Sequence, residues 1–97
     1  MSKQFYVYIL TSKKNGTLYT GVTSNLPQRI HQHKNNLFDG FCQKYNVKTM
    51  VYFEPHDSAE SAITREKQIK KWNRAWKLKL IEKNNPQWED LYNLILL

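Results

Sequence analysis

The residues that decide the fold are FYVYILTSKKNGTLYTGV, positions 5–22. Two runs within this stretch, residues 5–10 and 17–22, are rich in β-branched and aromatic side chains, which favour strands. Between the two runs, Asn15-Gly16 is a pair that suits a turn requiring positive φ. We therefore predict that residues 5–22 form a β-hairpin.

Two tripeptides on this hairpin contain tyrosine, Tyr6-Val7-Tyr8 on the first strand and Tyr19-Thr20-Gly21 on the second. A phenol can donate or accept a proton, so tyrosines gathered on one hairpin are candidates for acid-base chemistry. The alternative interpretation is structural, because tyrosines favour strands and fill half-buried sheet faces.

Alternation of side chains divides each predicted strand into two faces. On the first strand, one face carries Tyr6, Tyr8 and Leu10, and the other carries Val7 and Ile9. On the second strand, Tyr19 and Gly21 share a face. A third strand is predicted over residues 47–54, with Val47, Thr49, Val51 and Phe53 on one side and Met50 and Tyr52 on the other. We expect it to complete a small antiparallel sheet.

Helices are predicted around the sheet. The first begins within Thr23-Ser24-Asn25-Leu26-Pro27, where a polar cap precedes an early proline, and runs to about His33 or Lys34, with a loop over residues 35–40. The second is capped by Asp57 or Ser58 and extends to about Lys71. A short helix over 74–82 is separated by Asn84-Asn85-Pro86 from a terminal helix that begins at Gln87. The predicted fold class is α+β, a single domain over residues 1–97 with a three-stranded antiparallel sheet flanked by helices.

The composition narrows the classes of function. The 97 residues include 15 Lys and Arg against 8 Asp and Glu, a net charge of +7, which favours a polyanionic partner such as nucleic acid. The single cysteine, Cys42, cannot form an intramolecular disulfide, and the start of the chain does not resemble a cleavable signal, so we expect a cytoplasmic protein. No apolar run is long enough to span a membrane, so no membrane partner is expected.

Much of the positive charge lies in one stretch of the sequence, residues 65–83. Glu66 and Glu82 are its only acids, and Trp72 and Trp76 are interleaved with its bases. Such a stretch can bind phosphates independently of sequence. The basic residues are Arg65, Lys67, Lys70, Lys71, Arg74, Lys77, Lys79 and Lys83.

Three further side chains are candidates for chemistry. Glu66 falls on the apolar stripe of the second helix, where a carboxylate needs a hydrogen bond, a cation or a metal; a pair with Lys70 or Arg29 is the structural alternative. Arg29 and His33, four apart on the first helix, are neighbours on one flank. Arg29 can stabilise charge on a phosphate or pair with a surface acid, and His33 can position or protonate a group or fill a core.

In order and spacing, these residues resemble the GIY-YIG endonuclease superfamily, which is named for two tripeptides on adjacent strands. The resemblance runs from Tyr6-Val7-Tyr8 and Tyr19-Thr20-Gly21 through Arg29 and His33 to Glu66, nearly the full chain. It is closest to small single-domain bacterial members, which are similar to the catalytic domain of structure-specific junction nucleases and share the ending Asn85-Pro86-Gln87-Trp88-Glu89-Asp90-Leu91. Tyr6 replaces glycine, and Val7 and Thr20 replace isoleucines, in the family's tripeptides.

The resemblance implies an endonuclease that hydrolyses DNA phosphodiester bonds with one divalent cation, Mg²⁺ or Mn²⁺, and a role in repair or recombination. It implies that Glu66 is the metal ligand, that Tyr8 or Tyr19 acts as general base or orients the attacking water, and that Arg29 stabilises the phosphate, with His33 as a further site residue. Gly21 matches the glycine that lets backbone approach the site. The nucleic-acid-binding residues expected with it are Gly21, Lys67, Lys70, Lys71, Arg74 and Lys77.

Two other functions are compatible with the sequence. The first is a non-catalytic nucleic-acid-binding module of the same fold, which would keep the basic surface and cut nothing. The second is an accessory subunit that binds a protein partner or forms a homodimer through its apolar tail. The tail residues are Leu91, Leu94, Ile95, Leu96 and Leu97.

Overall fold

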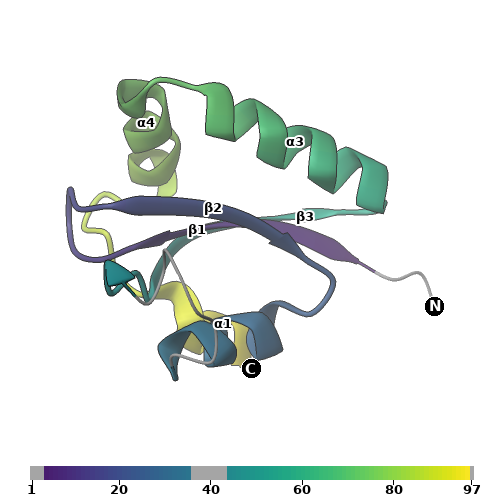
Figure 1. The fold of residues 1–97 in the computed structure, drawn as a ribbon, viewed down its shortest axis with the longest axis horizontal. Coiled ribbons are helices and arrows are strands. Elements are labelled where there is room, and N and C mark those ends of the chain that lie inside the picture. The colour runs from purple at the N-terminus through teal and green to yellow at the C-terminus, as the bar shows by residue number, and fades with distance from the viewer. Residues whose placement is uncertain (1–3, 36–43, 97) are drawn as a thin grey trace.

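The computed structural model describes residues 4–35 and 44–96, so Cys42, Leu97 and the predicted loop from residue 36 onward lie outside the described residues. Three strands form an antiparallel sheet in the order β2-β1-β3, and helices cover both of its faces (Figure 1). The predicted α+β class is therefore confirmed. In chain order the elements are β1 (Phe5–Thr11), β2 (Leu18–Thr23), α1 (Leu26–Lys34), β3 (Thr49–His56), α3 (Ala59–Lys71), α4 (Arg74–Asn84) and the 3₁₀ segment η1 (Leu91–Leu96).

The predicted hairpin is β1 and β2. Asn15 has φ 60°, the left-handed conformation that the turn signal requires, and the Gly16 N–H donates to the Lys13 carbonyl at 2.8 Å. The register sets Tyr8 opposite Gly21 and Leu10 opposite Tyr19. This register, and not the composition of either strand, brings the two tyrosine tripeptides side by side.

The sheet separates two apolar layers, as Figure 1 shows: α3 and α4 lie over one face, and α1 and the C-terminal segment lie over the other. Val7 and Ile9 of β1 are buried on the first face with Ala62 and Ile69 of α3, while Tyr8 is buried on the second face within the layer that α1 covers. The predicted alternation along β1 is confirmed.

The predicted alternation along β3 is wrong, because the strand contains a bulge. Ile9 pairs with Tyr52 and Leu10 pairs with Met50, which leaves Val51 as an extra residue. Val51 and Tyr52 consequently pack toward the same layer, and Phe53 joins Met50 in the other. A single extra residue therefore reverses the assignment of faces for the rest of the strand.

The C-terminal segment differs from the predicted helix that begins at Gln87. Residues 85–88 form a turn in which the Trp88 N–H donates to the Asn85 carbonyl at 3.1 Å and Trp88 has φ 57°, so the short 3₁₀ segment begins only at Leu91. Trp88 is buried among the residues of the layer under α3 and α4. A right-handed helix needs negative φ, so the positive φ at Trp88 prevents the predicted helix from beginning at Gln87.

This turn and the residues after it supply hydrogen-bond partners to the bulged edge strand β3. The Asn85 side-chain amide donates to the Val51 carbonyl at 3.0 Å, and the Asp90 carboxylate accepts from the Met50 N–H at 3.3 Å. Asn85 is itself buried, and its side-chain oxygen accepts from the Glu89 N–H at 2.9 Å. Backbone groups on the outer edge of β3 thus obtain partners from the C-terminal segment.

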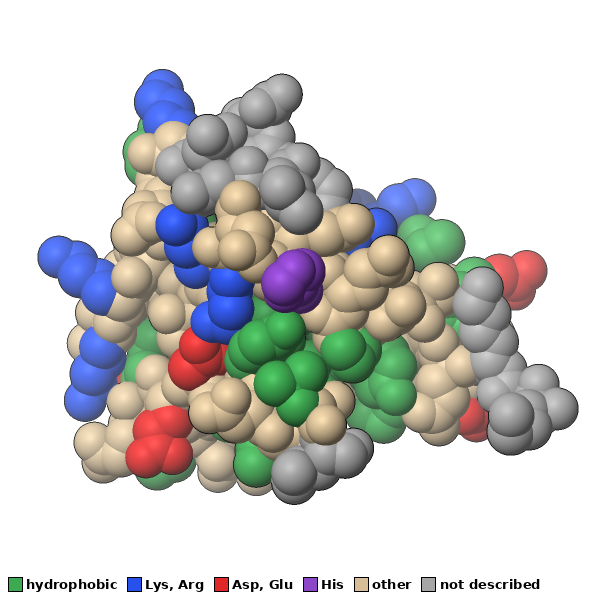
Figure 2. Space-filling view, turned by 90° about the horizontal axis from the view of Figure 1, so that it is seen from below, with side chains coloured by type: hydrophobic (Ala, Val, Ile, Leu, Met, Phe, Trp, Pro, Cys, Tyr) green, Lys and Arg blue, Asp and Glu red, His purple; other side chains and the backbone are tan. Residues whose placement is uncertain are grey.

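The apolar tail is only partly buried. Leu91 and Ile95 pack against the layer under α1, whereas Leu94 and Leu96 are 61% and 56% exposed. Figure 2 looks onto this side of the molecule, where hydrophobic side chains gather beside a histidine and are flanked by charged side chains. Two leucines of the tail therefore remain accessible, and the binding of a protein partner or of a second copy through the tail stays a prediction.

None of the helices within residues 4–35 and 44–96 has the length and apolar character needed to cross a bilayer.

Candidate functional site

A cluster of two tyrosines and one histidine occupies the α1 side of the hairpin. The ring centroids of Tyr8 and Tyr19 are 6.4 Å apart, and the His33 ring lies 6.0 Å from Tyr8 and 5.7 Å from Tyr19. The Tyr8 hydroxyl is 3.3 Å from His33 Nε2. Tyr8 and His33 are buried and Tyr19 is half-buried, so Tyr19 is the member of the cluster with a face toward solvent.

Gly21 is part of this cluster because the Tyr8 ring lies over it. A Cβ atom at Gly21 would come within 2.5 Å of Tyr8 Cζ and 3.0 Å of Cε1. The close approach that requires glycine is therefore made by an aromatic ring of the neighbouring strand. This space for Tyr8 is a structural reason for Gly21 that the sequence does not reveal.

Arg29 adjoins the cluster from the same helix as His33. Burial, and then the nearby charge of Arg29, lower the pKa of His33 from its ordinary value of 6.5. The predicted neighbourhood of these two residues is confirmed. A histidine with a lowered pKa is neutral at pH 7, and in that form one of its ring nitrogens can accept a hydrogen bond.

Glu66 is carried by α3, which covers the opposite face of the sheet from α1. Its carboxylate pairs with Lys70 Nζ at 3.0 Å, and the two side chains are 14% and 50% exposed. This is the local pair that the sequence left open as a structural alternative. An ion pair with a partner this exposed is weak and readily exchanged.

A hollow of about 240 Å³ connects the two layers at the end of the hairpin. Arg29 of α1, Val22 and Thr23 of β2, and Ala59 and Ile63 of α3 contribute to its lining. Ile63 lies one helical turn before Glu66, so the hollow places Arg29 on the same side of the molecule as this flank of α3. Arg29 is therefore the predicted catalytic residue that borders this hollow.

The basic residues expected to bind nucleic acid differ in their surroundings. Lys67 and Lys71 are exposed on α3, and Lys77 Nζ donates to the Lys70 carbonyl at 3.4 Å across the junction between α3 and α4. Arg74 instead donates to the carbonyls of Asn15 and Gly16 at 2.8 and 2.7 Å. Its guanidinium therefore joins the start of α4 to the hairpin turn.

A polar network at the end of β3 is a feature that the sequence interpretation missed. Glu54 accepts hydrogen bonds from the Tyr52 hydroxyl and, at 3.2 Å for each oxygen, from Arg65 Nε. His56 lies between Glu54 Oε2, at 2.5 Å, and Ser61 Oγ, at 2.6 Å. The alternation of Tyr52, Glu54 and His56 on one strand face was the available signal.

The electrostatics of this network are dominated by Glu54. Burial raises the pKa of Glu54, but hydrogen bonds from Tyr52, His56 and Arg65 outweigh burial and lower the pKa below its ordinary value. Burial and the bond to Glu54 raise the pKa of Tyr52. The network therefore holds an ionised carboxylate and a protonated phenol, an arrangement that ties β3 to the start of α3.

Comparisons with known proteins agree with the sequence motifs. The chain matches the GIY-YIG catalytic domain over residues 4–79. It is 40% identical over 85 residues to a UPF0213 protein of Syntrophus aciditrophicus, covering 87% of this chain and 95% of the relative. It is 39% identical over 85 residues to the UPF0213 protein CPE1444 of Clostridium perfringens, covering 88% and 90%. The solution NMR structure of the UPF0213 protein BH0048 from Bacillus halodurans is similar, with a TM-score of 0.57, 27% identity, and coverage of 94% of this chain and 96% of that one.

Proposed function

The chain belongs to the GIY-YIG family of nuclease domains, as its motifs predicted, and from this premise we propose that it is a divalent-metal-dependent endonuclease that hydrolyses DNA phosphodiester bonds. The observation that carries the proposal is the cluster of Tyr8, Tyr19 and His33 with Arg29 beside it. These side chains supply proton transfer and a phosphate-binding cation within one small region. Repair or recombination of DNA is the process that such an activity would serve.

Hydrolysis requires a water molecule to be aligned with the phosphorus and to lose its proton. Tyr19 is half-buried beside His33 and is the tyrosine that a substrate can reach, so it orients or deprotonates the water. Tyr8 is completely buried and acts through its contact with His33 Nε2 as a positioning residue. The lowered pKa of His33 keeps its imidazole neutral, which allows it to accept a hydrogen bond from the Tyr8 hydroxyl.

Arg29 is the residue that stabilises the charge developing on the phosphate. Its guanidinium presents a planar fork of donors that matches two phosphate oxygens. It lines the hollow at the end of the hairpin, where a DNA backbone can approach from solvent. Loss of such a donor typically lowers turnover by a factor of about a hundred or more.

Glu66 is the residue that would hold a divalent cation, as one carboxylate ligand. Within the described parts of the chain, no three His, Cys, Asp or Glu side chains converge as a metal site. Glu66 offers a single carboxylate whose pair with the exposed Lys70 is exchangeable. Mg²⁺ and similar ions accept one or two carboxylates together with substrate phosphate and water, so Glu66 would hold the ion. When bound, the ion supplies charge neutralisation at the phosphate.

The test is cleavage of labelled single-stranded, duplex and branched DNA with Mg²⁺ or Mn²⁺, beside an EDTA control. Glu66→Gln should lower the cleavage rate by at least about a hundredfold while DNA binding measured in EDTA is retained. Glu60→Gln, the same change on the first turn of α3, should leave the rate within about twofold. Full activity in Glu66→Gln contradicts the metal assignment, and binding without cleavage by the wild-type protein favours the non-catalytic module.

The role of Tyr19 is tested by comparing Tyr19→Phe with Tyr6→Phe as a matched control. Tyr19→Phe should lower cleavage by about a hundredfold or more, because only the phenolic oxygen is lost. Tyr6→Phe removes an equivalent oxygen from the same hairpin, where Tyr6 donates to Gln4, and should change the rate by less than about threefold. Unchanged rates in both Tyr8→Phe and Tyr19→Phe contradict the mechanism.

A further inference from the structure

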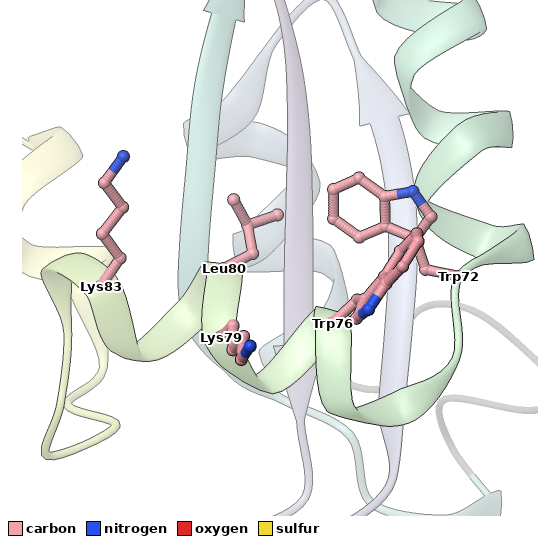
Figure 3. A pocket seen from close by; sticks show the side chains of 5 residues that line it. All are labelled: Trp72, Trp76, Lys79, Leu80 and Lys83. Atoms are coloured by element: carbon pink, nitrogen blue, oxygen red, sulfur yellow. The ribbon is translucent and has the colours of Figure 1, made fainter.

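Two tryptophans form a right-angled corner at the junction of α3 and α4. Trp72 and Trp76 have ring centroids 5.9 Å apart and an interplanar angle of 79°. Beside them is a hollow of about 290 Å³ whose other walls are Lys79, Leu80 and Lys83, all on α4 (Figure 3). The hollow is small and open, which suits one planar group held between an aromatic ring and aliphatic stems.

Trp72 has a packing role in the fold, whereas Trp76 is largely exposed. Trp72 ends α3, packs against the buried layer and lies under the Arg65 guanidinium at 5.1 Å. Trp76 stands on the first turn of α4 with 55% of its surface exposed. An exposed tryptophan beside an apolar wall contributes little to the folded monomer, so its surface is available to a ligand.

The charge around the corner identifies the kind of ligand. Lys79 and Lys83 are one turn apart on α4 and both border the hollow (Figure 3). Glu82, the acid on α4, is engaged with the Trp88 indole N–H at 2.7 Å. The surroundings of the exposed ring are therefore positively charged. Aromatic faces next to lysines are the combination that binds single strands, because bases stack on the ring while phosphates contact the cations.

We infer that Trp76 and Lys79 form a stacking site for an unpaired base of DNA, with Lys83 contacting an adjacent phosphate. The inference rests on the proposed function, since it assumes that DNA is the substrate, and it specifies single-stranded or branched DNA. In an intact duplex both faces of each internal base are already stacked. Only an unpaired base can present a face to Trp76, so the site selects DNA whose bases are free.

The test measures binding without cleavage, in EDTA, with three labelled ligands of equal phosphate number: a single strand of thymidines, the same strand with abasic positions, and a blunt duplex. Trp76→Ala should weaken binding of the thymidine strand by at least about fivefold, the loss expected for one stacked base. Its affinity for the abasic strand and for the duplex should change by less than about twofold. Trp76→Phe retains a ring and should restore most of the affinity.

Lys83→Gln provides the contrasting result. Because Lys83 contacts a phosphate in the proposed site, this variant should weaken binding of all three ligands and lower the dependence of affinity on salt concentration. Circular dichroism verifies the folding of each variant, and Trp76→Gln replaces Trp76→Ala if the latter is not folded. For the variant at Trp76, an equal loss for all three ligands, or no loss for the thymidine strand, overturns the inference.

The experiment separates this site from the nuclease proposal. Base-dependent binding in EDTA that disappears in Trp76→Ala supports the stacking site even if no cleavage is found under any condition. Conversely, metal-dependent cleavage that is lost in Glu66→Gln supports the nuclease even if Trp76→Ala binds every ligand normally. If the two tryptophans instead bind a protein partner, Trp76→Ala should not show a loss of DNA affinity that depends on the bases.

Discussion

Replacing Gly21 with alanine should destabilise the domain, because the added methyl group occupies the space of the Tyr8 ring. A Cβ at Gly21 would lie 2.5 Å from Tyr8 Cζ, whereas ordinary contacts begin at 3.4 Å. The ring must therefore retreat by about 1 Å. Tyr8 is completely buried on the α1 side of the sheet, so it has no solvent-exposed space into which it can move.

The magnitude follows from two opposing terms. Overpacking of a buried site costs about 1–3 kcal/mol in the free energy of unfolding. Alanine is better than glycine within a strand by about 0.5–1 kcal/mol, which offsets part of this cost. The expected net loss for Gly21→Ala is about 0.5–2 kcal/mol, and a loss of about 1 kcal/mol lowers the midpoint of thermal unfolding by roughly 4–8 °C in a domain of this size. Displacement of Tyr8 should also disturb its contact with His33 and reduce DNA cleavage.

The assay is urea unfolding of a double-mutant cycle. In a Tyr8→Leu background the ring is absent, so Gly21→Ala should become neutral or stabilising by up to about 1 kcal/mol. Tyr8→Phe is the intermediate case, since it removes the hydroxyl, which is the nearest atom to the added Cβ, but keeps Cζ and Cε1 in the clash. The coupling energy between positions 8 and 21 should therefore be about 1–3 kcal/mol with leucine and smaller with phenylalanine.

Additive effects of Gly21→Ala and Tyr8→Leu on the free energy of unfolding would exclude the Tyr8 ring as the cause. If Gly21→Ala has the same effect on stability with tyrosine and with leucine at position 8, the ring is not the reason for the glycine. An unchanged unfolding free energy in the single mutant would lead to the same conclusion.

Two further predictions concern other buried polar groups. Asn85→Ala should lower the free energy of unfolding by about 2–3 kcal/mol, because the Val51 carbonyl at the bulge loses its donor; urea unfolding should show almost no loss in Asn84→Ala, and equal losses would contradict the role of Asn85. Burial and Arg29 lower the pKa of His33, so the unfolded chain binds a proton that the folded chain does not, and stability that is complete above pH 6.5 should fall as the pH drops below that value. His33→Gln should flatten this slope in unfolding midpoints measured between about pH 7.5 and 5.5, and an unchanged slope would exclude His33 as its source.

Part of the site could be predicted from local sequence. The spacing of Arg29 and His33 on one helix made them neighbours, and the hairpin signal at Asn15-Gly16 brought the two tyrosine tripeptides together. The contact between His33 and Tyr8 could not be predicted in this way. It depends on how α1 packs across the sheet, which no periodicity within the helix reports.

The sequence by itself determined the hairpin, the third strand and the helices up to α4, because β-branched and aromatic runs, a turn pair and helix caps act over a few residues. Only the tertiary structure decided how these elements meet. The bulge at Val51 reverses the faces of β3, Asn85 reaches that bulge from far along the chain, and Glu66 lies on the opposite side of the sheet from Tyr8. Each of these relations joins residues distant in sequence, and their geometry is set by strand register and packing, which local preferences do not contain.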